Sequence, residues 1–283
     1  MSLKSATSKP LRALVVGGTS GIGEGIALAL ASRGYDVCIA GRSQERGEAV
    51  VEKLQSISPS NNGHKFIAVD GFDLKSFRVL KDQTVPEVLV MTQGMATLQG
   101  YTPTKADNLD QKLQLHYFSR IYLSKLLAPG MTKESQPRIL SVLSAGVHSQ
   151  YSHYEDDFEL QNNYSIKNAA DAAGFYNDAG FEAFSDENPS FVVAHASPGF
   201  VNTRWGTEMP GLLQSLVIRP MQSLFGKSSE ECGEILTESL LKISQPGYHL
   251  IDDKGREIAN GVRHTKEERD VIWSKTLELL PDL

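Results

Sequence analysis

A glycine-rich loop lies between a short apolar run and a helix-like segment, and it constrains the fold more than any other feature. Residues 11–16 are mostly apolar, the loop covers residues 17–23, and apolar residues recur at helical spacing from Ile22 to Leu30. Glycine permits positive φ and close approach to a pyrophosphate, and a helix N-terminus offers free N–H groups to phosphate oxygens. The pattern predicts a strand–turn–helix unit that binds a dinucleotide, rather than an ordinary glycine-rich turn. An NTPase phosphate loop is excluded, because no Lys-Ser or Lys-Thr pair closes the loop.

Strand-like and helix-like segments alternate along the rest of the chain. Continuous apolar runs such as residues 88–91 suit parallel strands that are buried on both faces. We predict an α/β fold, with a single Rossmann-type, doubly wound parallel sheet in a three-layer αβα arrangement. A flexible tail would cover residues 1–10, and one domain residues 11–283. The expected strands are 11–16, 36–40, 65–70, 86–92, 138–143, 191–196 and 248–251, and the expected helices are 22–32, 45–57, 107–127, 167–183, 228–243 and 266–280.

Composition limits the partners that the chain can bind. Its 283 residues carry a formal net charge of −6 and no basic tract, which argues against a nucleic-acid surface. The distant pair Cys38 and Cys232 indicates neither a disulfide nor a metal site, so we predict no metal. The first ten residues are polar, and no apolar stretch is long enough to span a membrane. We therefore expect a cytoplasmic protein without an integral membrane segment, and a homo-oligomer is possible.

The end of the second expected strand distinguishes NAD from NADP. NAD sites usually carry an acidic residue there, which bonds the ribose 2′-hydroxyl. Here residues 40–43 read Ala-Gly-Arg-Ser and contain no carboxylate. The planar guanidinium of Arg42 suits a phosphate, and Arg46, one turn further on, is placed to assist it. The alternative is a solvated surface arginine. We predict NADP(H) as the cofactor.

These features together resemble the short-chain dehydrogenase/reductase superfamily over nearly the whole chain. The family loop Thr-Gly-x-x-x-Gly-x-Gly is matched by Gly17, Gly21 and Gly23, with Val16 in place of the threonine. Gly94 matches the last residue of the family's Asn-Asn-Ala-Gly motif, whose first three residues differ here. The resemblance implies a Rossmann fold and an oxidoreductase that uses a nicotinamide cofactor.

Two further segments carry the resemblance. Residues 73–74 look like the family's adenine-contacting pair, and residues 198–203 match its Pro-Gly-x-x-x-Thr segment, which flanks the nicotinamide. The loop, the second strand and the resemblance together imply a set of cofactor contacts: Gly17, Thr19, Ser20, Gly21, Ile22, Gly23, Arg42, Ser43, Asp73, Leu74, Gly94, Lys167, Pro198, Gly199, Val201 and Thr203.

The family's proton chemistry uses a serine, a tyrosine and a lysine. Ser144 matches the serine, which bonds the substrate oxygen, and Tyr164 and Lys167 match the tyrosine and the lysine that lowers the tyrosine pKa. The family places this lysine four residues after the tyrosine, whereas here the spacing is three, and both spacings share a helix face. The alternative is a surface tyrosine and a solvated lysine. His116 replaces the family's helical asparagine, and it either handles a proton or a water, or is a core histidine.

Residues 204–227 fall where the family places a substrate lid. Trp205 and Met209 would give this lid an apolar wall, so an apolar small-molecule substrate is expected. Tyr151, His153 and Tyr154 fall near the expected mouth of the site. The resulting prediction is an NADP(H)-dependent oxidoreductase that interconverts a carbonyl and an alcohol. The alternatives are non-redox chemistry on the same fold (cyclisation, isomerisation or dehydration) and cofactor sensing without catalysis.

Overall fold

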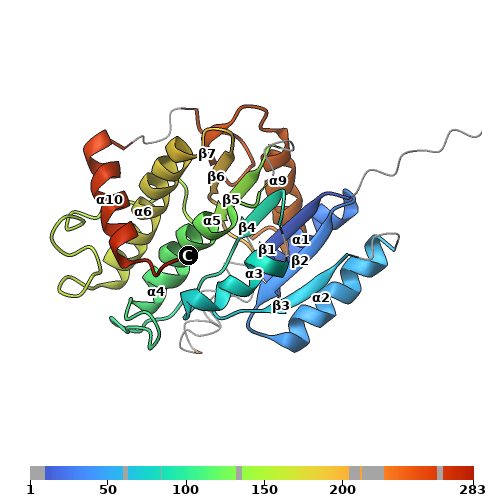
Figure 1. Cartoon of the computed structure of the whole chain (residues 1–283), viewed down its shortest axis with the longest axis horizontal. Coiled ribbons are helices and arrows are strands. Elements are labelled where there is room, and N and C mark those ends of the chain that lie inside the picture. The colour runs from blue at the N-terminus through green and yellow to red at the C-terminus, as the bar shows by residue number, and fades with distance from the viewer. Residues whose placement is uncertain are drawn as a thin grey trace, which may run out of the picture.

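A parallel β-sheet forms the middle layer of the molecule (Figure 1). The computed structural model describes residues 10–59, 63–83, 85–131, 136–203, 211, 226–259 and 264–283. Within these residues the sheet has seven strands in the order β3-β2-β1-β4-β5-β6-β7, and every pairing is parallel. The strands are β1 (Arg12–Val16), β2 (Asp36–Gly41), β3 (Lys65–Ala68), β4 (Val88–Met91), β5 (Arg138–Val142), β6 (Val192–Ala196) and β7 (Gly247–Ile251).

Helices cover both faces of this sheet. One face packs against α1 (Gly21–Ser32), α2 (Gln44–Ile57) and α9 (Ser229–Lys242). The other face packs against the short η1 (Leu74–Phe77) and α3 (Arg78–Gln83), the helix that runs from α4 (Gln111–Leu113) into α5 (Ser119–Leu127), α6 (Ile166–Glu187) and α10 (Lys266–Leu279). The prediction of a doubly wound, three-layer α/β fold is confirmed.

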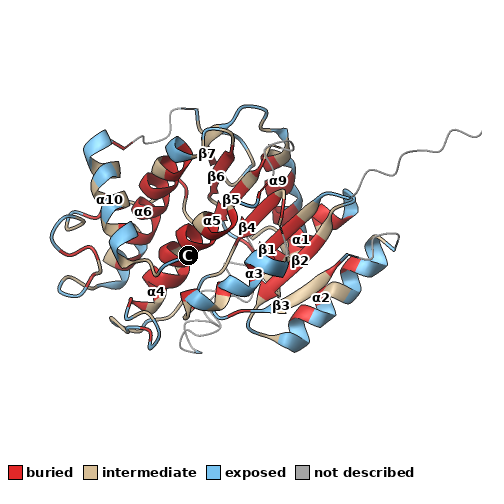
Figure 2. Ribbon diagram, in the orientation of Figure 1, coloured by how far each residue is buried: buried red, intermediate tan, exposed pale blue. Residues whose placement is uncertain are grey.

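Alternation along each strand explains why the sheet needs cover on both sides. In β1, Ala13 and Val15 join the apolar core on one face, whereas Leu14 and Val16 join the core on the other. Successive side chains of a strand point to opposite faces, so a strand that is apolar at every position is stable only between two helical layers. In Figure 2 the central strands are coloured mostly as buried, whereas the edge strand β3 is mostly intermediate.

The strand order reverses beside β1, and this reversal places the site. β1 pairs with β2 on one side and with β4 on the other, so that Leu14 lies between Cys38 and Leu89. The connections that leave β1 and β4 run to opposite faces of the sheet, and a crevice opens between them at the carboxyl ends of the strands. Ligands of such sheets bind in this crevice.

The long helix that the sequence predicts over residues 107–127 is shorter and irregular. It begins at Gln111, because the Asp110 carboxylate caps it by accepting hydrogen bonds from the N–H groups of Lys112 and Leu113, at 3.0 and 3.2 Å. Residues 114–118 form a π-helical turn, η2 (Gln114–Phe118). The sequence analysis predicted neither this turn nor η1 and α3.

Helices α1 and α9 cross at two glycines. A Cβ built on Gly25 would overlap the Ser229 carbonyl group, whose carbon would lie only 2.7 Å away, and a Cβ on Gly233 would overlap the backbone of Gly25 and Ile26. The two backbones therefore approach as closely as they do only because neither residue carries a side chain.

We expect Gly25→Ala to lower the free energy of unfolding by about 1–3 kcal/mol, because the added methyl group pushes α9 away from α1. Gly100→Ala is the matched control, since a Cβ there meets nothing within 4 Å, and its effect should stay within about 0.5 kcal/mol. Urea unfolding followed by circular dichroism measures both. Equal urea midpoints for Gly25→Ala and Gly100→Ala would contradict the view that the close approach of α1 and α9 stabilises the fold.

Residues 1–9 of the expected tail and residues 204–210 and 212–225 of the expected lid lie outside the described residues. Among the helices that the structure describes, none combines the length and the apolar character that a membrane crossing requires.

Candidate active site

A cavity of about 400 Å³ opens at the carboxyl ends of β1, β4 and β5. The glycine-rich loop forms one wall, and the segment after β4 forms another. Residues that the sequence analysis predicts for the site line it: Gly17, Thr19, Ser20, Gly21, Ile22, Gly23, Arg42, Arg46, Gly94, His116, Pro198 and Thr203. The loop, the end of β2 and the segment at 198–203 therefore converge on one space.

The glycines of the loop form a cradle that larger residues would fill. Gly17 has φ of +82°, and a Cβ there would lie 2.7 Å from the backbone nitrogen of Gln93. A Cβ on Gly23 would lie 2.5 Å from the Gly17 carbonyl oxygen. The Ser20 side chain makes no capping bond to the first turn of α1. The cradle and this helix N-terminus fit the pyrophosphate of a dinucleotide.

Arginines supply the charge at the end of the cavity beside β2. Arg42 and Arg46 both line the cavity, and the Arg42 guanidinium carbon lies 5.3 Å from the centre of the Phe72 ring. Ser43 caps α2 by accepting a bond from the Arg46 N–H, at 3.4 Å. No aspartate or glutamate is among the described residues that line the cavity. This end of the cavity therefore favours an anionic group.

A buried arginine forms the floor between β4 and β5. Arg120 is 1% exposed, and it donates to Ser141 Oγ (2.7 Å), to the Val142 carbonyl (3.0 Å) and to the Gln93 carbonyl (2.7 Å). Burial lowers the pKa of Arg120 to about 9, so the side chain is charged at neutral pH. It presents a fixed cation to the cavity.

His116 lies in the π-helical turn at the edge of the cavity. Its Nε2 accepts a hydrogen bond from the Met95 N–H at 3.0 Å, and its carbonyl accepts one from Asn177 Nδ2 at 2.6 Å. Burial, with smaller contributions from the cations of Arg120 and Lys112, lowers the pKa of His116 to about 3. The ring is therefore neutral at physiological pH, and it holds the segment after β4 in place. Of the interpretations left open by the sequence, this geometry favours a structural core histidine over a proton carrier.

Ser144 lies two residues beyond the end of β5. Its N–H donates to His195 Nε2 at 3.2 Å, and its carbonyl lies 3.1 Å from His148 Nδ1. The neighbouring Val142 and Leu143 line the cavity, whereas Ser144 is not among the described lining residues. The two histidines hold the peptide groups on both sides of its Cα.

Tyr164 and Lys167 bond to different partners. The Tyr164 hydroxyl accepts a hydrogen bond from Lys112 Nζ at 2.8 Å and donates one to the Gln99 carbonyl at 3.2 Å. Lys167 forms an ion pair with Asp171, and its side chain is 75% exposed. The structure therefore pairs Tyr164 with Lys112, a residue that the sequence analysis did not consider. Burial, followed by the charge of Asp110, raises the pKa of Tyr164 to about 12.

Asp73 and Leu74, the two residues expected to contact the adenine, are not among the described residues that line the cavity. The Asp73 carboxylate caps η1 by accepting from the Lys75 N–H, and Leu74 is fully buried in the core. Val69 and Gly71, just before this pair, line the cavity instead.

The segment after β6 reaches the cavity only in part. Pro198 and Thr203 line it, whereas Gly199, with φ of +66°, packs beside Asp253, and Val201 is buried and forms a bridge with Lys227. The three residues expected near the mouth, Tyr151, His153 and Tyr154, bond acidic side chains at residues 155–157. Tyr151 is buried.

Comparison with known families and proteins gives a consistent result. Residues 12–155 match the family model described as short chain dehydrogenase. The chain is 30% identical over 268 residues to Oxidoreductase AN1596 of Emericella nidulans, a match that covers 89% of this chain and 79% of that protein. It is 28% identical to the short-chain dehydrogenase/reductase SAT2 of Stachybotrys chartarum, over 79% of this chain and 70% of the relative.

A solved structure shows the same fold. The alcohol dehydrogenase of the archaeon Thermococcus sibiricus, complexed with 5-hydroxy-NADP, aligns with a TM-score of 0.63 at 17% identity. The alignment covers 91% of this chain and the whole of that chain.

Proposed function

Because this chain belongs to the short-chain dehydrogenase/reductase family, we propose that it is an NADP(H)-dependent oxidoreductase that interconverts a carbonyl and an alcohol on an apolar small molecule. The observation that carries the proposal is the cavity above the glycine cradle. Its end beside β2 holds Arg42 and Arg46, and the described residues that line the cavity include no carboxylate. A 2′-phosphate there would meet two guanidinium groups, whereas an unphosphorylated ribose would lack the acidic partner that NAD sites usually provide.

We expect Arg42→Ala to weaken NADPH binding by about 10- to 100-fold, because the 2′-phosphate loses one or more charge-assisted hydrogen bonds. NADH has no such phosphate, so its binding should change by no more than about twofold. Fluorescence titration of both cofactors at one ionic strength measures the effect. Arg256→Ala is the control, because Arg256 is an exposed arginine that pairs with Asp252. Equal losses for both cofactors, or a wild-type preference for NADH, would refute the NADP(H) assignment.

Proton transfer is assigned to Ser144 and Tyr164, which lie outside the described lining of the cavity. When bound, the cofactor supplies or accepts a hydride at the substrate carbon. In the proposal, the Ser144 hydroxyl donates to the substrate oxygen, which gains negative charge during reduction. Tyr164 exchanges a proton with that oxygen. Lys112, in place of Lys167, holds the Tyr164 hydroxyl through the 2.8 Å hydrogen bond.

Apolar side chains support the proposed substrate class. Met95, Leu115 and Leu143 line the cavity beside the segment after β4 and the end of β5. Such walls bind apolar ligands through burial of their surface, while a few polar groups orient them. A panel of aromatic and aliphatic ketones, scored by NADPH consumption, would test this class.

A second candidate is non-redox chemistry on the same fold. It is favoured by one observation, namely that neither Ser144 nor Tyr164 is among the described residues that line the cavity. In that case the substrate would change while the amount of NADPH stays constant. Following product formation and the absorbance of reduced nicotinamide in the same sample separates the two functions.

A further inference from the structure

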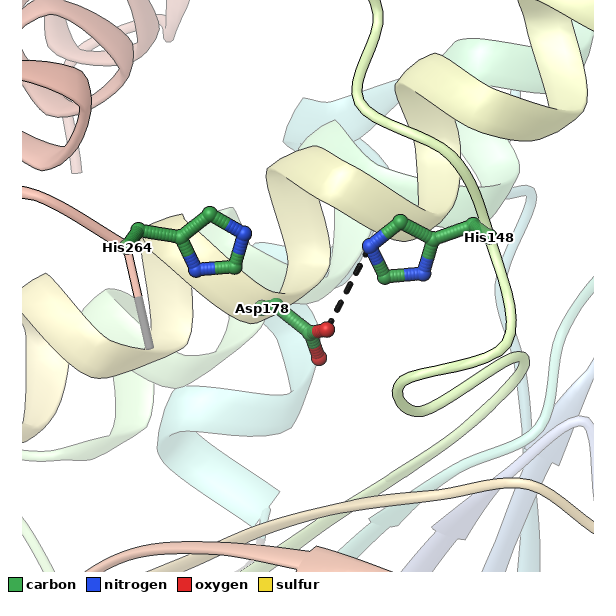
Figure 3. A group of neighbouring side chains, drawn as sticks. All are labelled: His148, Asp178 and His264. Atoms are coloured by element: carbon green, nitrogen blue, oxygen red, sulfur yellow. Dashed lines mark ion pairs between the residues drawn. The ribbon is translucent and has the colours of Figure 1, made fainter. Parts of the chain in front are cut away.

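Three metal-ligating side chains from distant parts of the chain meet behind Ser144. His148 follows β5, Asp178 lies in α6, and His264 precedes α10, yet their ligand atoms lie within 4.8 Å of one another (Figure 3). Their side chains are only 7%, 0% and 4% exposed. None of the three is among the described residues that line the cavity.

His148 cannot satisfy both of its neighbours as a neutral ring. Its Nδ1 lies 3.1 Å from the Ser144 carbonyl oxygen, and its Nε2 lies 3.3 Å from Asp178 Oδ2. A neutral imidazole carries one N–H, so donation to the carbonyl leaves a lone pair on Nε2 that faces a carboxylate. Either a second proton or a metal ion must lie between Nε2 and Asp178.

Hydrogen bonds to Oδ1 of Asp178 hold the carboxylate so that its Oδ2 faces His148. Oδ1 accepts from His195 Nδ1 at 2.5 Å and from the Tyr248 hydroxyl at 2.6 Å. His195 must carry its hydrogen on Nδ1, because its Nε2 accepts from the Ser144 N–H. Oδ2 has no hydrogen-bond partner in the described part of the chain although it is buried, so one carboxylate oxygen is left available in the cluster. His264 Nδ1 also has no hydrogen-bond partner there, and it lies 3.8 Å from Glu182 Oε2.

We infer that His148, Asp178 and His264 form a binding site for a divalent transition-metal ion, with Zn²⁺ as the ion that suits it best. Two imidazoles and a carboxylate are a common protein ligand set for zinc. Zinc bonds of about 2.0–2.2 Å in tetrahedral geometry place neighbouring ligand atoms about 3.3 Å apart, which is the separation of His148 Nε2 and Asp178 Oδ2. His264 completes the set by a ring movement of roughly 1–1.5 Å.

Surrounding residues fit the outer shell of such a site. His195 and Tyr248 fix the non-ligating oxygen of Asp178, and the Ser144 carbonyl fixes the tautomer of His148. Hydrogen-bonded partners of this kind orient metal ligands in known sites. Glu182 Oε2 lies 3.8 Å from His264 Nδ1 and is a further carboxylate close to the site.

The site would connect three segments that are far apart in sequence. His148 is bonded to the Ser144 carbonyl, so the metal would hold the turn that carries Ser144 against α6 and the start of α10. Its role is structural and does not require the proposed cofactor. A failure of the oxidoreductase assignment would therefore leave this inference unaffected.

Metal binding by untagged protein tests the inference. After treatment with a chelator and its removal, Zn²⁺ is titrated into wild type, His264→Gln and the control His153→Gln, whose exposed ring pairs with Asp156. Wild type and control should bind one Zn²⁺ per chain and gain thermal stability. Loss of a residue that only hydrogen-bonds a metal ligand costs about 10–100-fold in metal affinity, so His264→Gln, which removes a ligand, should lose at least that much and show no gain in Tm.

The result that overturns the inference is equal Zn²⁺ content and equal Tm change in wild type and His264→Gln, which would leave His148 and Asp178 as an ordinary ion pair. Co²⁺ bound to wild type provides a readout that does not depend on a variant that folds. The intense visible absorption of four-coordinate Co²⁺, removed by stoichiometric Zn²⁺, supports the site. A spectrum identical to that of Co²⁺ in buffer refutes it.

Discussion

Replacing Tyr164 with phenylalanine should lower turnover by about 10²–10⁴-fold, the range that general acid–base catalysis supplies, while NADPH affinity stays within about twofold. The variant removes only the hydroxyl that bonds Lys112 and the Gln99 carbonyl. It keeps the ring, which packs edge-on against Tyr101 with 6.2 Å between the ring centres. Initial rates of NADPH oxidation with a ketone found in the substrate panel measure turnover, and fluorescence titration measures affinity. Unchanged turnover would remove Tyr164 from the mechanism.

The lysine partner of Tyr164 can be identified by two matched variants. Lys112→Met removes the ammonium that bonds the hydroxyl, so turnover should fall nearly as far as in Tyr164→Phe. Lys167→Met removes an exposed ammonium that pairs with Asp171, so turnover should remain at the wild-type level. The opposite result would restore Lys167 as the partner.

The same pair gives a pH dependence. Burial raises the pKa of Tyr164 to about 12 and lowers that of Lys112, so the phenol is protonated throughout the neutral range. Carbonyl reduction consumes a proton from this phenol and should keep its rate from neutral into alkaline pH. Alcohol oxidation needs the phenolate and should become faster as pH rises toward the pKa of Tyr164. A rate of reduction that falls near neutral pH would contradict this assignment.

Replacing Arg120 with methionine should lower the free energy of unfolding by about 2–6 kcal/mol, because the buried acceptors on Ser141 and Val142 lose their donor at about 1–3 kcal/mol each, and the partly buried Gln93 carbonyl loses one as well. Removal of a buried charge offsets part of this loss, as the lowered pKa of Arg120 indicates, but the acceptors remain in place. NADPH affinity should fall as well, since the floor of the cavity loses its cation.

Two comparisons make the Arg120 result specific. Arg120→Lys keeps the charge but not the planar fork, and it should lie between wild type and Arg120→Met in urea unfolding. Arg256→Met removes an exposed arginine and should leave the midpoint unchanged. If Arg120→Met unfolds at the wild-type midpoint, Arg120 does not support the ends of β4 and β5.

The fold and the phosphate cradle could be predicted because they depend on local patterns. Each strand is an apolar run that needs cover on both faces, and the glycines of residues 17–23 are needed wherever a strand turns into a phosphate-binding helix. The structure confirms the sheet and brings most of the loop residues to the cavity. Of the two helices that the sequence does not predict, η1 is capped by Asp73, a residue that the family resemblance links to the cofactor, and α3 follows directly after η1.

The acid–base pair could not be predicted, because the spacing rule assumes a continuous helix. Ser165 caps α6, so Tyr164 precedes the helix, whereas Lys167 lies in its first turn and points to solvent. Residues three apart share a face only when both are helical. The observed partner, Lys112, is 52 residues away, and the sequence contains no pattern that links the two. The role of Arg120 is not predicted for a similar reason, since its carbonyl acceptors lie at the end of β5 and in the segment after β4, far from it in sequence.

The glycine crossing of α1 and α9 means that cofactor affinity can be altered from outside the cavity. Gly25 lies one helical turn from Gly21, so the first turn of α9 supports from behind the helix N-terminus that would face the phosphates of the proposed cofactor. A bulky residue at Gly233 would overlap the backbone of Gly25 and Ile26 and push α1 and α9 apart, which would displace the N-terminus of α1 without touching any residue of the cradle. Substitutions in α9 are therefore expected to change the affinity for the proposed dinucleotide, although no residue of α9 is among the described residues that line the cavity.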